Sequence, residues 1–113
     1  MKSLPMSQND LDIFKKNASK ASDLLKKMSH PDRLLVLCHL SFGELSAGEL
    51  AKRSQLSLSA FSQHLAILRE AGLIKTRRVA QTLYYSIQNE SVLHILATLK
   101  EIFCPEVTET TKE

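Results

Sequence analysis

Hydrophobic residues recur at helical spacing along most of the chain. From Asp10 to Met28, apolar side chains fall at i, i+3, i+7, i+10, i+14 and i+17, which is one stripe of an amphipathic helix. A second helix is expected over Asp32–Phe42, just after Pro31. It is apolar nearly all round, which is typical of a buried helix at the centre of a domain. A last helix is expected over 90–104, because Pro105 cannot continue it.

Between these helices, the stretch from Leu45 to Arg78 predicts two short helices, a turn between them and a strand. Ser46 with Glu49 forms a capping box that begins the first short helix. Ser57 offers an N-cap for the second, which should end before Gly72. The outward face of this second helix carries Ser59, Ser62, Gln63 and Ala66. Such a small, polar face suits insertion into a DNA major groove, although an ordinary surface helix fits the periodicity equally well.

Two β-type runs follow, over about 74–79 and 83–87, around the tip Ala80-Gln81-Thr82. A helix-turn-helix followed by a basic hairpin is the layout of a winged helix, whose hairpin reaches a minor groove or phosphates. The predicted fold class is therefore mainly α with a β-hairpin wing (α+β): four helices, the hairpin and a fifth helix. The candidate contacts near the tip are Arg77, Arg78, Gln81 and Thr82.

Composition limits the domain organisation and the kinds of partner that the chain can have. With 113 residues and 43% apolar side chains, the chain is expected to form one domain over 10–104. A loose polar arm is expected over 1–9 and a disordered acidic tail over 105–113. The net charge of +3 is compatible with phosphate contact but does not prove it. With no membrane-length apolar stretch and no signal peptide, the protein is expected to be cytoplasmic and away from membranes.

Specific motifs then give a family resemblance. The runs SAFSQHL (59–65) and LREAGLI (68–74) resemble the signature of the ArsR/SmtB family of bacterial repressors, and QTLYY (81–85) is similar to its second wing strand. The resemblance spans about residues 10–104. It implies a non-enzymatic homodimer, paired through the first and last helices, that binds an inverted repeat in double-stranded operator DNA. The expected base-reading residues are Ser57, Ser59, Ser62, Gln63 and His64, and Arg69 is a further expected DNA contact.

Many members of that family sense metals, but their ligand patterns are missing here. The run ELSAGEL (44–50) has no sulfur where metal sensors carry Cys-x-Cys. On the last helix His94 stands without the partners of an Asp-x-His site. The four histidines show no i, i+3 or i+4 pairing, and an isolated histidine is usually packed or solvated. We therefore expect no metal site and no cofactor.

The two cysteines are the remaining candidates for an effector site. Taken alone, Cys38 and Cys104 fit either small buried hydrophobes or reduced thiols with a chemical role. The resemblance is greatest to the HlyU/BigR/SqrR subgroup, which carries one cysteine on each of these two helices and is similar to thiol sensors. It implies a repressor whose operator affinity is set by oxidation or sulfur bridging of Cys38 and Cys104. The effector would be a reactive sulfur species or another oxidant.

Three other functions are alternatives to a thiol-regulated repressor. The first stays open, and the other two are disfavoured. An ArsR-type regulator without a thiol switch, acting by displacing another DNA-bound repressor, would use the same residues. A winged helix that binds only protein is disfavoured by the polar reading face and by the pair Arg77 and Arg78. A small thiol oxidoreductase would need Cys-x-x-Cys near a βαβ unit, and neither is present in the sequence.

Overall fold

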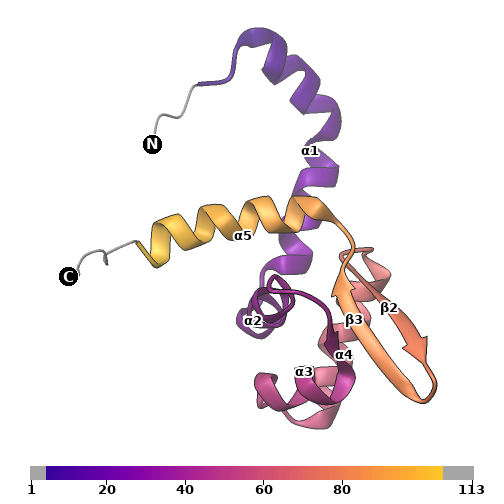
Figure 1. Ribbon diagram of the computed structural model, residues 1–113. Helices are drawn as coiled ribbons and strands as arrows, with labels where there is room; N and C mark the ends of the chain where they lie inside the picture. Colours follow the sequence, from indigo (N-terminus) through magenta and orange to yellow (C-terminus); the bar gives the residue numbers. More distant parts are fainter. Residues whose placement is uncertain (1–4, 106–113) are drawn as a thin grey trace.

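The computed structural model describes residues 5–105 and confirms a winged helix-turn-helix (Figure 1). The elements are α1 (Gln8–Met28), α2 (Pro31–Leu40), β1 (Leu45–Ser46), α3 (Ala47–Ser54), α4 (Leu58–Glu70), β2 (Ile74–Val79), β3 (Thr82–Ile87) and α5 (Glu90–Phe103). The expected disordered tail lies outside the described residues except for its first residue, as does the beginning of the expected arm. No helix in the described range is long and apolar enough to cross a membrane.

Serine caps begin three of the helices. Ser46 and Ser57 accept hydrogen bonds from the backbone N–H groups three residues on, at 3.1 and 3.2 Å, so α3 and α4 begin as predicted. Ser7 forms a capping box with Asp10, and α1 therefore begins two residues before the expected position. Gly72 ends the α4 turn at φ +76°, a conformation that glycine adopts without steric cost.

The sheet contains a strand that the sequence did not predict. Its order is β1-β3-β2, all antiparallel, and β1 consists of only two residues. Leu45 pairs with Tyr85, while Val79 pairs with Thr82 across the hairpin, which leaves Ala80 and Gln81 as the loop. Because β1 directly precedes α3, this pairing joins the wing to the helix-turn-helix.

The core lies where α2, α3 and α4 meet the sheet. Its buried side chains are Met28, Val36, Leu37, Leu40, Leu50, Phe61, Leu65, Leu68, Leu73, Ile74, Tyr85 and Val92. These residues come from every element except β1, so the helices and the hairpin share one apolar core.

The prediction that α2 is buried all round was wrong. Val36, Leu37 and Leu40 face the core, but Leu35 is 56% exposed and Cys38 is also exposed. The helix ends at Leu40, and Phe42 beyond it is 88% exposed. The reason is that the core covers only one side of α2, while the other side faces a cavity beneath α5.

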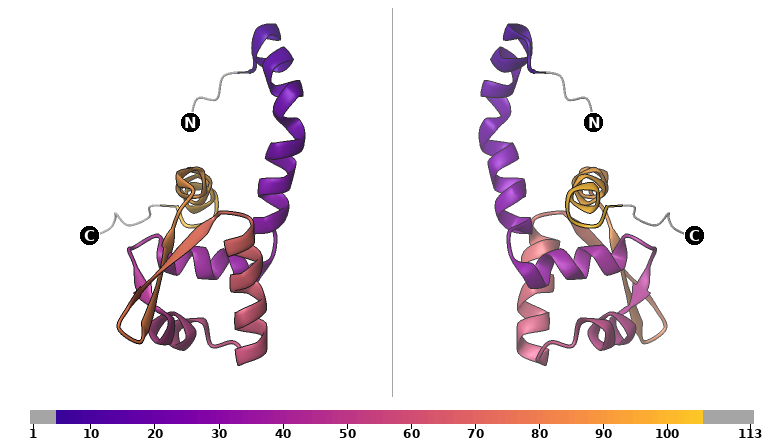
Figure 2. Two further views of the ribbon diagram at one scale, coloured as in Figure 1. Left: turned by 90° about the vertical axis from the view of Figure 1, so that its right-hand side faces the viewer. Right: turned by 90° about the vertical axis from the view of Figure 1, so that its left-hand side faces the viewer.

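Two helices extend beyond the core. Figures 1 and 2 show α1 rising away from α2, α3, α4 and the sheet, with α5 running across above α2. Both helices expose large apolar side chains: Leu11, Ile13, Phe14 and Leu25 on α1, and Leu93, Ile102 and Phe103 on α5. Exposed apolar surface on this scale is typical of a protein contact surface.

Candidate nucleic-acid interface

Helix α4 presents one apolar and one polar face. Phe61, Leu65 and Leu68 are buried in the core. Ser59, Ser62 and Gln63 are exposed on the outward side. The N-terminal half of the helix therefore offers hydroxyl and amide groups to a partner, although Leu58 at its first position is a large apolar side chain that is also exposed, which the sequence pattern did not predict on this face. These groups can accept and donate hydrogen bonds to base edges.

Two further candidates near α4 have defined surroundings. The Ser57 hydroxyl accepts from the Ala60 N–H, so part of its hydrogen-bonding capacity is used to begin the helix. Arg69 is exposed and lines, together with Ser62 and Tyr85, a hollow of about 380 Å³ between α4 and β3. The hollow connects the exposed face of α4 with the side of the wing.

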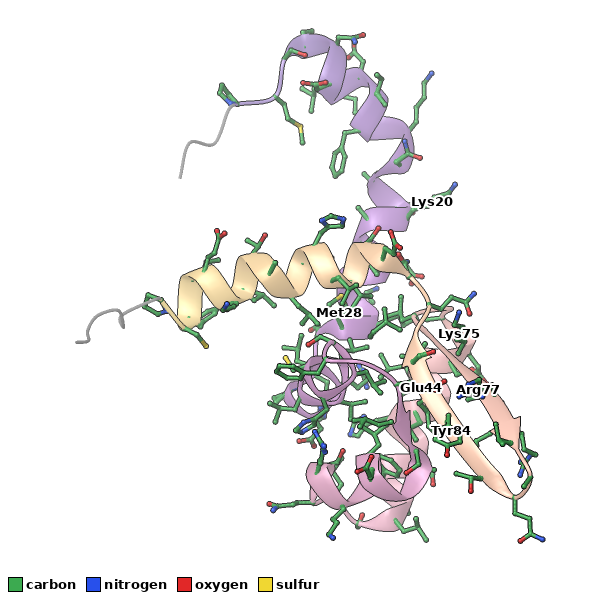
Figure 3. All side chains as sticks on the ribbon, in the orientation of Figure 1. Lys20, Met28, Glu44, Lys75, Arg77 and Tyr84 are labelled. Atoms are coloured by element: carbon green, nitrogen blue, oxygen red, sulfur yellow. The ribbon has the colours of Figure 1, made fainter. Side chains whose placement is uncertain are left out.

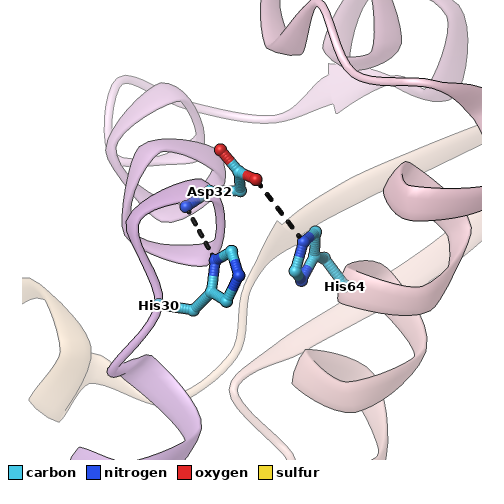
Figure 4. Close-up of side chains that lie close together, drawn as sticks. All are labelled: His30, Asp32 and His64. Carbon is cyan, nitrogen blue, oxygen red and sulfur yellow. Dashed lines mark hydrogen bonds and ion pairs between the residues drawn. The ribbon is translucent and has the colours of Figure 1, made fainter.

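His64 differs from the other candidates on α4 because its side chain is turned towards α2. Only 12% of that side chain is exposed, and its ring centroid lies 4.4 Å from that of His30 (Figure 4). Its Nε2 lies 3.7 Å from the Asp32 carboxylate. Burial lowers the pKa of His64, with smaller contributions in the same direction from His30 and Arg33 and an opposing one from Asp32. The ring is therefore favoured in its neutral form.

On the wing, Arg77 already has a partner. Its Nε and Nη2 donate to both carboxylate oxygens of Glu44, at 2.7 and 2.8 Å, and its guanidinium lies 4.9 Å from the ring centroid of Tyr84 (Figure 3). This hydrogen bonding lowers the pKa of Glu44 and raises that of Arg77. The neighbouring Arg78 has no ion-pair partner among residues 5–105.

The remaining wing candidates surround the hairpin loop. Arg78, Gln81 and Thr82 are all exposed. Ala80 in the same loop has φ +55°, which allows the hairpin to close with two loop residues. The structure thus gathers the tip residues at the end of the wing that lies farthest from α5 (Figure 1).

The two cysteines lie in the wall of one cavity. The cavity has a volume of about 540 Å³ and lies between α2 and α5, and most of its lining is apolar. Cys38 and Cys104 are both free, exposed and apart. Burial raises the pKa of Cys38, and the negative charge of an ionised Cys104 raises it further. Of the two interpretations of the cysteines, that of small buried hydrophobes is therefore wrong, since both side chains are exposed, and the raised pKa of Cys38 keeps its thiol mostly protonated at neutral pH.

The fold also assembles a group that sequence reasoning missed. Nitrogen and oxygen atoms of His30, Asp32 and His64 lie within 4.8 Å of one another, a set that could hold a metal ion. His30 and His64 are far apart in the sequence and meet because α2 crosses α4. Residue spacing carries no signal for this contact.

The hydrogen bonds of this group do not fit a metal ion. His30 Nδ1 accepts from the Asp32 backbone N–H at 3.0 Å, and His64 Nδ1 lies 3.4 Å from Arg33 Nη1, which can only donate. In neutral rings both Nε2 atoms then carry the proton that a metal would have to replace. A metal-bound histidine normally donates its other N–H to an acceptor, whereas here both Nδ1 atoms face donors.

The comparisons with known proteins agree with this geometry. Residues 30–76 match the family described as bacterial regulatory protein, arsR family. The HTH-type transcriptional regulator YgaV of Escherichia coli is 56% identical over 90 residues, which cover 79% of this chain and 91% of that protein. The chain therefore belongs to the ArsR family of DNA-binding transcriptional regulators, and it is not an enzyme.

Two further relatives place the chain within the family. The transcriptional activator HlyU of Vibrio cholerae is 43% identical over 104 residues, which cover 92% of this chain and 94% of that protein. The crystal structure of the transcriptional repressor BigR from Xylella fastidiosa gives a TM-score of 0.79 at 35% identity, covering 88% of this chain and 98% of that one. The predicted resemblance to the HlyU/BigR subgroup is thus confirmed.

Proposed function

We propose that the protein is a homodimeric repressor that binds an inverted repeat in operator DNA and is released when Cys38 and Cys104 are oxidised or bridged by sulfur. The observation that carries the DNA-reading part is the outward face of α4, where Ser59, Ser62 and Gln63 are exposed. Arg69, Arg78, Gln81 and Thr82 then supply contacts on either side of that face. A regulator of this kind acts in the cytoplasm.

The exposed apolar faces of α1 and α5 support the homodimer. Phe14 on α1 is 41% exposed, and Phe103 on α5 is 75% exposed. Pairing two copies through these helices would remove this surface from water and place two α4 helices for successive major grooves. Two-fold symmetry also explains why the operator should be an inverted repeat.

The shared cavity supports the thiol switch, because α2 packs on the DNA-binding core while α5 belongs to the expected dimer interface. A Cys thiolate that attacks a polysulfide takes up sulfane sulfur and releases a polysulfide shortened by the same amount. When the Cys then carries two added sulfurs, the second thiolate attacks the inner one and releases HS⁻. The two thiols lose two electrons, the leaving sulfur is reduced, and a Cys–S–S–S–Cys link remains.

Inserted sulfur suits two thiols that lie apart. A direct disulfide requires Cα atoms within about 7 Å, and added sulfur atoms extend that reach. The link would fix α5 against α2 and shift the spacing of the two α4 helices. Such a shift is a two-state change of the kind that a regulator needs.

The test combines an operator-binding assay with mass spectrometry. The reduced protein should bind its operator with an affinity that falls steeply between two salt concentrations, since DNA binding releases counterions. Treatment with polysulfide should form one intramolecular link that contains added sulfur, and it should weaken operator binding about tenfold or more. Cys38→Ser and Cys104→Ser should each bind like the reduced protein and stay bound after treatment. A single-cysteine variant that polysulfide still releases would contradict the two-thiol mechanism, but not the repressor.

One relative favours a second candidate. HlyU of Vibrio cholerae is named a transcriptional activator, and a regulator that displaces another DNA-bound repressor would activate without a thiol switch. In vitro transcription separates the two functions. A repressor lowers transcription from its promoter on its own, whereas a displacing regulator changes transcription only when the other repressor is present.

A further inference from the structure

The end of α1 is held by a side chain from the next helix. The Lys27 carbonyl belongs to the last turn of α1, where carbonyls lack a partner within the helix. Arg33 on α2 donates its Nε–H to this oxygen at 2.7 Å, and both residues are half-buried. Arg33 therefore caps α1 from outside and fixes the direction in which α1 leaves α2.

The beginning of α2 is fixed at the same place. The His30 ring accepts the Asp32 N–H and so provides the N-cap, and Pro31 takes the first helical position. We call residues 27–33 the α1–α2 junction. One side chain caps each helix end, so the junction has little freedom to bend.

His64 is the point at which α4 meets this junction. Its Nδ1 lies 3.4 Å from Arg33 Nη1, and its ring lies against His30 (Figure 4). Arg33 thus contacts the end of α1 through one nitrogen and α4 through another. A guanidinium has donors pointing in several fixed directions and can do this, whereas the single ammonium of a lysine cannot hold both partners in the same geometry.

We infer that Arg33 is a positioning residue for DNA binding, which holds the α4 reading face at a fixed angle to α1 through His64 without touching DNA. The inference rests on the proposed function in one respect, namely that α4 reads the operator. If α1 contributes to the dimer, the spacing between the two α4 helices of a dimer depends on this angle. Arg33 then affects operator recognition from within the protein.

A direct phosphate contact by Arg33 is disfavoured by the same geometry. Two of its nitrogens are directed at Lys27 and His64, inside the protein. Arg33 as a whole is also only half-exposed, which leaves its guanidinium less available to a phosphate than that of the exposed Arg78. The Arg33 guanidinium therefore binds groups on α1 and α4 within the protein.

The experiment measures operator and non-specific DNA binding of the full chain at several salt concentrations. Arg33→Lys keeps the charge, and His64→Leu removes the acceptor. Each should weaken operator binding about tenfold while non-specific affinity and the salt dependence stay unchanged. The double variant should be no worse than either single variant, because both break the same contact. His64→Asn, which can still present an oxygen to Arg33, should bind within about twofold of wild type.

The matched control is Asp23→Asn. Asp23 forms an exposed ion pair at 3.9 Å with the side chain of Lys27, near the same helix end, but has no ion pair with Arg33 or His64. Asp23→Asn removes only this side-chain pair and leaves the Lys27 carbonyl, Arg33 and His64 in place, so the variant should bind the operator like wild type. Thermal melting is measured in parallel, and binding is compared well below each midpoint, so that a loss of folding is not read as a loss of positioning.

Three results would overturn the inference. Additive losses in the double variant would mean that Arg33 and His64 act separately. An equal loss of operator and non-specific affinity in Arg33→Lys would make Arg33 a direct phosphate contact. A lower melting temperature with unchanged operator affinity would leave only a structural role. If Gln63→Ala binds the operator like wild type, the proposed reading face itself is wrong. If Gln63→Ala weakens operator binding but Arg33→Lys does not, only the inference about Arg33 is refuted.

Discussion

The Arg77 guanidinium binds both carboxylate oxygens of Glu44, which joins the wing to the segment that leads into β1. Arg77 was expected to be a free DNA contact, and the structure shows its charge already paired within the protein. The adjacent Arg78 is exposed without such a partner in the described part of the chain. Two consecutive arginines on one strand thus have different surroundings.

This difference predicts different salt dependences for two alanine variants. Arg78→Ala should remove about one phosphate contact and reduce the slope of log affinity against log salt by about one. Arg77→Ala should change the slope less, because Glu44 already offsets its charge, and should lower affinity mainly by loosening the wing. Fluorescence anisotropy with a labelled operator at four salt concentrations measures both slopes. Equal slope changes would show that Arg77 leaves Glu44 and binds phosphate.

Gln63→Ala tests the reading face of α4. An exposed glutamine amide can pair with an adenine edge, so its loss should cost about 1–3 kcal/mol of operator binding. Non-specific binding should stay nearly constant, since the phosphate contacts remain. Competition between operator and random duplexes measures the ratio of specific to non-specific affinity. If the ratio is unchanged, Gln63 does not read bases.

The raised pKa of Cys38 predicts a slow thiol at neutral pH. In Cys104→Ser the contribution of the Cys104 charge is lost, but burial continues to raise the Cys38 pKa. Alkylation by iodoacetamide should therefore reach half its limiting rate above pH 8.5, roughly the pKa of an ordinary cysteine. Mass spectrometry of samples quenched at successive times gives the alkylation rate at each pH. A midpoint at or below that of an unstructured cysteine peptide would contradict the effect of burial.

The lowered pKa of His64 predicts that acid weakens the fold. The unfolded chain binds a proton at this residue more readily than the native protein does, since burial, His30 and Arg33 all disfavour the charged ring and Asp32 only partly opposes them. This contribution to the free energy of unfolding is complete above about pH 6.5. It is lost as the pH falls from there towards the lowered native pKa.

Urea unfolding between pH 5 and pH 8 measures the effect. His64→Asn should flatten the pH dependence in that window, while the other histidines are retained as an internal control. A steeper dependence in the variant would mean that the charged ring is favoured in the native state, with Asp32 as its dominant partner.

The hydrogen bonds around His30 and His64 predict that the reduced protein has no tight zinc site. Equilibrium dialysis against Zn²⁺ should give no stoichiometric binding below micromolar concentration, because both Nδ1 atoms face donors. A sub-micromolar site that disappears in His64→Asn would contradict this prediction. It would also make His30, Asp32 and His64 ligands.

Sequence patterns predict the parts of this fold that depend on local spacing. The buried residues of α4 repeat at the helical period, and Ser46 and Ser57 mark the beginnings of α3 and α4 by local hydrogen bonds. The exposure of Ser59 and Gln63 follows from the same period. For these reasons the sequence alone predicts the helix-turn-helix and the outward face of α4.

Contacts between distant segments could not be derived in this way. The two residues of β1 are too few to show alternation, and their pairing with β3 depends on the hairpin. The apolar residues of α2 do not reveal which side of the helix remains uncovered. Arg77 with Glu44 and His64 with Arg33 are pairs formed by the crossing of elements, to which residue spacing is blind.

The short strand β1 has a consequence for the DNA. Leu45 and Ser46 pair with β3 and lead directly into α3, so the wing is tied to the helix-turn-helix. This pairing then sets the distance between the wing and α4. A duplex that binds both elements, as proposed, would have to adjust its groove width and twist to that distance. Base pairs between the two contacts would therefore be selected for how easily they deform, although no side chain touches them.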